Sequence, residues 1–327
     1  MSFPDVRPRR LRVSAAMCRL VEQTQVEPAQ LVLPMFVRQG LDAPRPIASM
    51  PGVVQHSRDS LRKAAVEAVQ AGVGGLMLFG IPASRDEVGS GGTDPRGILN
   101  VAIHDVVAEV GTDTVVMSDL CLDEFTSHGH CGVLTADGRV DNDATLERYA
   151  EMAVAQADAG VHVVGPSGMM DGQVGVVRRA LDAAGHQDVT ILAYAVKYAS
   201  AFYGPFRDAV ESALTGDRKT YQQDPPNLTE ALREARLDVA EGADIVMVKP
   251  ALPYLDVVAA VSAAVDVPVA AYQISGEYAM VEAAVASGWL ERDRAIIETL
   301  TSITRAGARV ILTYWAVAAA RLLRDRY

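Results

Sequence analysis

The sequence contains little cysteine and lacks the long apolar runs that membrane helices need. Its three cysteines, Cys18, Cys121 and Cys131, are an odd and sparse set, which argues against a disulfide framework and favours the reducing cytoplasm. No apolar run approaches the roughly 18 residues that span a bilayer, and the basic N-terminus lacks the apolar core of a secretory signal. A net charge of −11 argues against nucleic acid or an anionic membrane as the main partner. The composition therefore predicts a soluble cytoplasmic protein.

Lysine is also scarce, because only four of the 30 basic residues are lysines. Unlike arginine, a desolvated lysine can lose its proton and form a Schiff base with a carbonyl compound. Lys63 and Lys219 lie in charged, polar neighbourhoods that are typical of the protein surface. Lys197 and Lys249 follow apolar runs instead, and these two are the candidates for chemistry that arginine cannot perform.

Eight apolar runs rich in β-branched residues alternate with stretches in which apolar residues recur every three or four positions. Continuous apolar strands that alternate with helices indicate a parallel sheet covered by helices. Eight such units favour a closed (β/α)8 TIM barrel, a single α/β domain over residues 31–327, with an open doubly wound sheet as the alternative. The predicted strands are 31–37, 74–81, 115–122, 161–168, 189–196, 244–250, 267–274 and 309–315.

Two segments fall outside this alternation. Residues 1–30 carry the basic run "RPRRLR" and predict an extended arm, which either is a disordered tail or wraps a neighbouring subunit. Residues 204–227 form a connection far longer than ordinary loops between strand and helix, which is typical of an active-site lid.

The barrel prediction brings the unusual residues together, because active sites of such barrels lie at the carboxyl ends of the strands. Lys197 directly follows the fifth strand and Lys249 ends the sixth, so the two amines are expected to be neighbours. Each positive charge is expected to depress the pKa of the other amine, and desolvation adds to the effect. Other polar residues predicted at the same ends are Asp119, Ser167, Ser275 and Tyr314.

The stretch "SDLCLDEFTSHGHCG", residues 118–132, offers thiols, a carboxylate and an imidazole. Cys121, Asp123, His130 and Cys131 are a plausible mixed set for zinc. The spacing is not diagnostic, since two small buried cysteines and a loop histidine would give the same pattern. A position at the end of a barrel strand beside two lysines favours a catalytic metal over a structural one.

Arg207 and Arg218 on the predicted lid have the geometry to hold a carboxylate, although ordinary solvated arginines are the alternative. Together these residues indicate a Schiff-base enzyme with two amines. An aldolase with one Schiff-base lysine acting on a sugar phosphate would leave the second lysine and the cysteine cluster unexplained. A barrel retained only for metal binding or regulation also stays open, because a fold does not dictate a function.

Segments along nearly the whole chain resemble the porphobilinogen synthase (delta-aminolevulinic acid dehydratase) family, in particular its actinobacterial members. The resemblance implies a barrel with an N-terminal arm that assembles into a homo-octamer. It also implies a hydro-lyase that condenses two 5-aminolevulinate molecules into porphobilinogen, an early step towards heme. The lysine-bearing segments are the most specific, and the segments include "DLCLDEFTSHGHCG", "YAVKYASAFYGPFRDA", "GDRKTYQQDP", "EGADIVMVKPALPYLD" and "YQISGEYAM".

The same resemblance implies roles for individual residues. Lys249 matches the lysine that forms an imine with the substrate giving the propionate side of the product, and Lys197 matches the lysine for the acetate side. Asp119 and Ser167 match polar groups near the second lysine and the metal. The residues expected to hold the substrates are Ser275 and Tyr314 for the first, and Arg207, Arg218 and Gln222 for the second, with Tyr203 as a further substrate-binding residue.

The metal ligands are where this chain departs from the family pattern. Zinc-dependent members are similar to "C-x-C…HC", whereas Asp123 replaces the middle cysteine here. Because Cys121, Cys131 and His130 are retained, we expect zinc rather than magnesium at this position. Glu234 matches a glutamate that binds activating magnesium at a subunit interface. Three further departures, each near a strand end, are Gly168, Gln173 and Arg309.

Overall fold

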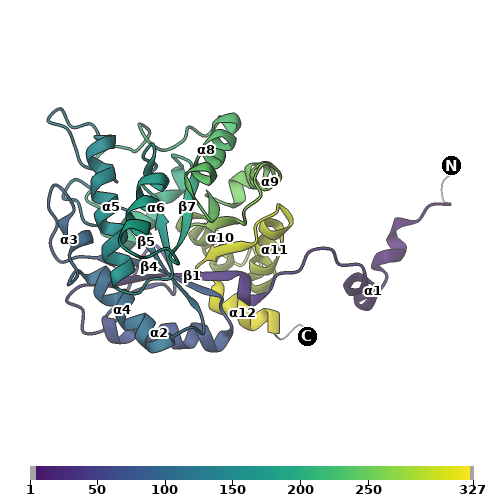
Figure 1. The fold of residues 1–327 in the computed structure, drawn as a ribbon. Coiled ribbons are helices and arrows are strands. Elements are labelled where there is room, and N and C mark those ends of the chain that lie inside the picture. The colour runs from purple at the N-terminus through teal and green to yellow at the C-terminus, as the bar shows by residue number, and fades with distance from the viewer. Residues whose placement is uncertain (1–4, 325–327) are drawn as a thin grey trace.

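Eight parallel strands close into a barrel in the computed structural model, which describes residues 5–324 (Figure 1). The last strand pairs with the first, through Leu31 with Ile311 and Val32 with Leu312, so the alternative of an open sheet is wrong. The strands are β1 (Leu31–Arg38), β4 (Gly75–Ile81), β5 (Val115–Leu120), β6 (Val163–Pro166), β7 (Thr190–Lys197), β8 (Ile245–Lys249), β9 (Val269–Gln273) and β10 (Val310–Thr313).

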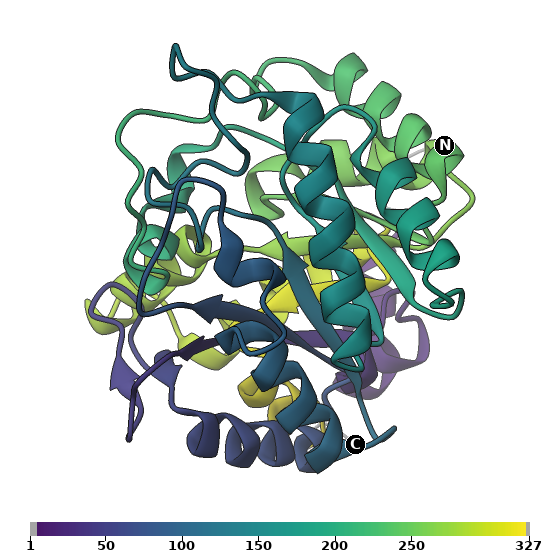
Figure 2. The same ribbon diagram turned by 60° about the vertical axis from the view of Figure 1, so that its left-hand side comes forward.

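The helices form a ring outside the barrel and cover it (Figures 1 and 2). Strands that are buried on both faces must be apolar throughout, and every residue of β4 is buried. The ring consists of α2 (Arg58–Ala71), α4 (Ile98–Val110), α5 (Asn142–Asp158), α6 (Gln173–Ala183), α8 (Leu228–Glu241), α9 (Leu255–Ala264), α10 (Ser275–Ala286), α11 (Arg292–Arg305) and α12 (Ala316–Arg324).

Helix α2 illustrates how local sequence sets these elements. The Ser57 hydroxyl caps its first turn by accepting a hydrogen bond from the Ser60 amide. Its buried residues, Leu61, Ala65, Ala68 and Ala71, follow the three- and four-residue spacing of a single helix face. The helix ends at Gly72, whose φ of 83° is left-handed and suits glycine.

The strand ends differ from the predicted ones in a way that matters for the site. Strand β5 ends at Leu120, so Cys121 and Asp123 lie in the loop after the strand rather than on its face. Ser275 begins helix α10 instead of ending a strand. The prediction also missed a short hairpin, β2 (Arg45–Pro46) and β3 (Val54–His56), in which β3 extends the sheet beside β1.

The segment before β1 runs away from the barrel (Figure 1). Its first two short helices, η1 (Pro8–Arg12) and α1 (Ala15–Leu20), bury no residue. Contact with the barrel begins near Val26, which is buried. The first four residues of the predicted arm lie outside the described residues. Within residues 5–324, no helix combines the length and the apolar character that crossing a bilayer requires.

Candidate active site

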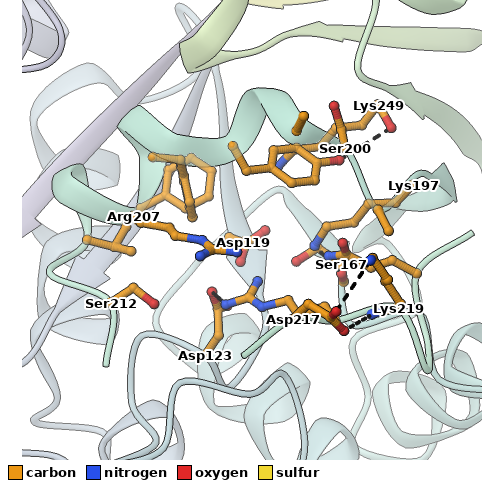
Figure 3. Close-up of a pocket in the computed structure, with 18 residues that line it drawn as sticks. Asp119, Asp123, Ser167, Lys197, Ser200, Arg207, Ser212, Asp217, Lys219 and Lys249 are labelled. Carbon is orange, nitrogen blue, oxygen red and sulfur yellow. Dashed lines mark hydrogen bonds and ion pairs between the residues drawn. The ribbon is translucent and has the colours of Figure 1, made fainter. Parts of the chain in front are cut away.

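The two candidate lysines meet at the carboxyl end of the barrel. Lys197 is the last residue of β7 and Lys249 the last of β8, and the two residues are paired across the adjacent strands. Both side chains are buried. They line a cavity together with Asp119, Ser167 and the lid residue Arg207 (Figure 3). The predicted juxtaposition of the two amines is therefore confirmed.

Aromatic rings surround the Lys249 amine. Burial, and after it the positive charge of Lys197, lower the pKa of Lys249 to about 7. A substantial fraction of this amine is therefore neutral at pH 7, as attack on a ketone requires. The distances from its Nζ to the ring centroids are 4.5 Å for Tyr272, 5.1 Å for Tyr194, 5.2 Å for Phe206 and 5.5 Å for Tyr203.

Lys197 has a different environment, and its expected depressed pKa is wrong. Burial by itself would lower the pKa of Lys197, but the nearby groups of Cys131, Cys121 and Asp123 outweigh burial and raise it. Its Nζ also donates a 2.6 Å hydrogen bond to the Ser167 carbonyl oxygen. These three groups lie in the loop after β5, and the spacing of the sequence does not reveal that they approach Lys197.

Three of the four predicted zinc ligands come together. One ligand atom from each of Cys121, Asp123 and Cys131 lies within 4.8 Å of the others, and all three residues are buried. His130 lies outside this group, with its Nδ1 atom 3.1 Å from the Tyr221 hydroxyl. Two thiols and a carboxylate fit a zinc site with three protein ligands and an open position, whereas the role of His130 stays a prediction.

Asp123 and Arg218 form a buried ion pair. The Arg218 Nη2 atom lies 2.7 Å from an Asp123 carboxylate oxygen and also donates a 2.9 Å hydrogen bond to the Gly129 carbonyl oxygen. Burial acts to raise the pKa of Asp123, but the Arg218 charge outweighs it and holds this pKa well below its usual range. The structure thus joins a predicted metal ligand to a predicted substrate-binding arginine, a pairing that the sequence did not indicate.

Asp119 lies in the same cavity as the two amines. Burial raises its pKa to about 6, although the Lys197 charge acts in the opposite direction. A carboxyl group whose pKa lies near the working pH is suited to general acid–base catalysis.

The lid covers this cavity. It contains α7 (Gly204–Ala209), preceded by the short helix η3 (Ala201–Tyr203), and Tyr203, Arg207, Arg218 and Gln222 all line the cavity as expected. Glu211, in a left-handed conformation with φ of 52°, pairs with Arg38 at 2.8 Å and also with Arg45. These ion pairs attach the lid to β1 and to the hairpin that the prediction missed.

Ser275 and Tyr314 are both buried, but neither is among the residues that line the cavity containing Lys249. The Tyr314 hydroxyl lies 3.0 Å from the hydroxyl of Tyr272, whose ring faces Lys249. The Ser275 hydroxyl has no hydrogen-bond partner among the described residues, so it is available to a bound molecule. Their contact with substrate stays a prediction.

Two supporting residues were missed by the sequence argument. The Tyr149 hydroxyl donates a 2.6 Å hydrogen bond to the Cys131 carbonyl oxygen and lies 3.7 Å from the Cys121 sulfur, so it holds the two thiols together. A Cβ atom at Gly168 would clash with this hydroxyl, which explains the glycine. Glu277 accepts hydrogen bonds from the Ile274 amide at 2.7 Å and the Leu252 amide at 2.5 Å, and so ties the loops after β8 and β9 together.

The positions of Gln173, Arg309 and Glu234 in the structure are as follows. Gln173 is buried and accepts a 3.2 Å hydrogen bond from the Met170 amide, which fixes the loop after β6. Arg309 is exposed just before β10, at the end of the barrel opposite the lysines. Glu234, on α8, lines a second cavity with Asp171 and Glu230. Burial raises the pKa of Glu234, and the charges of Asp171 and Glu230 add to the shift.

A closed (β/α)8 barrel with two buried amines at the carboxyl ends of adjacent strands is typical of enzymes that form Schiff bases with a carbonyl substrate. Comparison with known proteins identifies the family. The family model described as delta-aminolevulinic acid dehydratase matches residues 5–322, and the chain belongs to this family.

Relatives with the same description agree with this chain over almost its whole length. The delta-aminolevulinic acid dehydratase of Streptomyces coelicolor is 68% identical, covering 99% of this chain and 98% of the relative. That of Mycobacterium tuberculosis is 67% identical, covering 98% of each chain. The Toxoplasma gondii ME49 enzyme, also called porphobilinogen synthase and solved with its reaction product porphobilinogen, superimposes with a TM-score of 0.95 at 42% identity, covering 98% of this chain and 92% of that one.

Proposed function

We propose that Lys249 and Lys197 each form an imine with one 5-aminolevulinate molecule. As a member of this family, the chain is a hydro-lyase that converts 5-aminolevulinate into porphobilinogen, an early step of heme biosynthesis. The observation that carries the assignment of residues is the pair of buried amines on neighbouring strands in one cavity.

The two amines start from different protonation states. The neutral fraction of Lys249 attacks the ketone carbon of one substrate, and loss of water gives the imine. Lys197 holds its proton more firmly and must release it before it attacks the second ketone. Asp119, whose pKa of about 6 lies near the working pH, is the group in the cavity suited to move this proton.

Polar side chains are available for the substrate carboxylates. Arg207 and Gln222 on the lid are proposed to hold the carboxylate of the second substrate, with Arg218 joining them when it is not paired with Asp123. Ser275 and Tyr314 are proposed to hold the carboxylate of the first substrate. A closed lid also excludes bulk water, which would otherwise hydrolyse the imines.

The group of Cys121, Asp123 and Cys131 is proposed to hold zinc, with His130 as a further candidate ligand. Zinc would supply Lewis acidity beside Lys197. The acidic cavity around Glu234 is proposed to take magnesium, because a divalent cation would relieve the mutual repulsion of its carboxylates. The thiols of Cys121 and Cys131 are free, so we place the protein in the reducing cytoplasm.

The activity and the metal proposal are tested together by pyrrole formation from 5-aminolevulinate, on protein treated with a chelator and then resupplied with one metal. We expect zinc to restore colour with Ehrlich's reagent. Restoration by magnesium alone would move the metal role to Glu234 and leave the thiols structural. No colour with either metal, in protein that is folded by circular dichroism, would refute the activity.

The arm is proposed to pack on a second copy of the chain, in a homo-oligomer that we expect to be an octamer. Its described part exposes apolar side chains that nothing in the single chain covers, including Leu11, Val13 and Leu20. Deletion of residues 1–25 is expected to lower the number of chains per assembly, calculated from the mass measured by light scattering, with no loss of secondary structure in the barrel. An unchanged number of chains per assembly would contradict this role. Val115→Ser, which changes another exposed apolar position, is the control and should leave that number unchanged.

A further inference from the structure

The two imine-forming lysines differ in what surrounds their nitrogen atoms. Four aromatic rings lie over the Lys249 Nζ, whereas Lys197 has one, that of Tyr194 at 5.6 Å. The four rings, here called the aromatic cage, come from separate parts of the chain: Tyr194 from β7, Tyr272 from β9, Tyr203 from η3 and Phe206 from the lid helix α7. Their convergence on one nitrogen atom therefore depends on the fold and on a closed lid.

Imine chemistry creates a requirement at this nitrogen atom. The Lys249 Nζ forms a bond to the ketone carbon, the ketone oxygen leaves as water, and uptake of one proton leaves a positively charged iminium group. Only this protonated form withdraws electrons strongly enough to activate the neighbouring carbon atoms. However, the burial and the Lys197 charge that keep the free amine neutral also oppose a positive charge on the imine.

We propose that the aromatic cage stabilises the iminium form of Lys249 through cation–π interactions. Ring faces carry partial negative charge and attract a cation within about 6 Å, most strongly where water is excluded. The carboxyl groups of Asp119 and Asp123 also act on Lys249, but Asp123 acts on Lys197 and belongs to the proposed metal group as well. The rings add stabilisation without a further titratable carboxylate. Because Phe206 belongs to the lid, the cage is complete only when the lid is closed.

Phe206 is the best position for a test, because it has no hydroxyl group and so contributes only its ring. Replacement by 4-fluoro-, 3,5-difluoro- and 3,4,5-trifluorophenylalanine weakens the negative face stepwise while nearly keeping the shape. Each variant is mixed with 5-aminolevulinate and sodium borohydride, and the reduced adducts on Lys249 and Lys197 are quantified by peptide mass spectrometry. We expect the logarithm of the rate of adduct formation on Lys249 to fall linearly with the number of fluorine atoms. The rate with three fluorine atoms should be about tenfold lower than with none.

Two controls separate this effect from packing. The same series at Phe36, whose ring centroid lies 5.9 Å from that of Phe206, changes the packing around the cage without changing its rings and is expected to leave the Lys249 rate unchanged. The Lys197 adduct in the Phe206 variants is the internal reference. Equal losses at Phe36 and Phe206, or a flat series at Phe206, would refute the cage.

The inference rests on the proposed role of Lys249, and the experiment distinguishes the two. Absence of a Lys249 adduct in the unmodified enzyme, with Lys197 labelled, would refute the role of Lys249 itself. If the Lys249 adduct forms at a rate that does not depend on fluorination, the role of Lys249 in imine formation stands and only the aromatic cage is refuted. If the trifluorinated variant fails to fold, the mono- and difluorinated variants still define the slope.

Discussion

Lys249→Arg is expected to lower the rate of porphobilinogen formation by about four orders of magnitude or more. Arginine reaches as far as lysine and carries a positive charge, but its guanidinium group stays protonated and does not form an imine. A role of Lys249 in charge alone would therefore survive the change, whereas a role as nucleophile would not. The measurement is pyrrole formation in protein whose fold is verified by circular dichroism.

Lys63→Arg is the matched control, because Lys63 is exposed on α2 and we expect full activity from this variant. Borohydride trapping then shows where the imine forms. In Lys249→Arg we expect any remaining adduct to lie on Lys197, and in Lys197→Arg on Lys249. Activity of Lys249→Arg within tenfold of the unmodified enzyme would contradict imine formation at this residue.

The fold and the meeting of the two lysines could be predicted because they depend on local patterns. Apolar runs such as 74–81 predict strands directly, and eight alternations of strand and helix leave few topologies other than a barrel. Once the barrel is assumed, the strand ends place Lys197 and Lys249 together whatever the details of packing. This inference needed no knowledge of side-chain contacts.

The features that were missed depend on contacts between residues distant in the sequence. The raised pKa of Lys197 comes from groups on a loop some 70 residues earlier in the chain. Gly168 appeared as an unexplained departure because its neighbour Tyr149 lies on another element, α5. The pairing of Asp123 with Arg218 could not be predicted either, since Asp123 had been assigned to the metal and Arg218 to the substrate carboxylate. Spacing alone does not reveal such pairs.

The environments of the two lysines explain how two identical substrate molecules can be treated differently. Lys249 has an apolar, aromatic environment that leaves its amine partly neutral near pH 7. Lys197 lies beside the thiols of Cys131 and Cys121 and the carboxylate of Asp123, which raise the pKa of its amine. An asymmetric product from one substrate requires such a difference, because the substrate itself supplies none. We therefore propose that the asymmetry comes from the protein, through the loop that carries Cys121 and Cys131 on one side and the aromatic rings on the other.

Asp123→Cys is expected to strengthen zinc binding and to destabilise the metal-free protein. A third thiolate in place of a carboxylate should tighten zinc binding by about 100-fold, because thiolates are the softer ligands. Without zinc, Arg218 would lose its buried partner, and we expect the metal-free variant to be less stable by about 3–5 kcal/mol. Zinc affinity is measured by competition with a chromophoric chelator, and stability by denaturant unfolding with and without zinc.

Asp113→Cys, at an exposed position before β5, is the control for adding a thiol and should change neither quantity. Unaltered zinc affinity in Asp123→Cys would show that residue 123 is not a ligand. Unaltered stability of the metal-free variant would show that the ion pair contributes nothing. If both quantities change as expected, Asp123 serves Arg218 in the metal-free protein and the metal in the loaded one. Zinc binding would then free Arg218 for the substrate carboxylate, and the requirement for metal would include a lid residue as well as the reacting atoms.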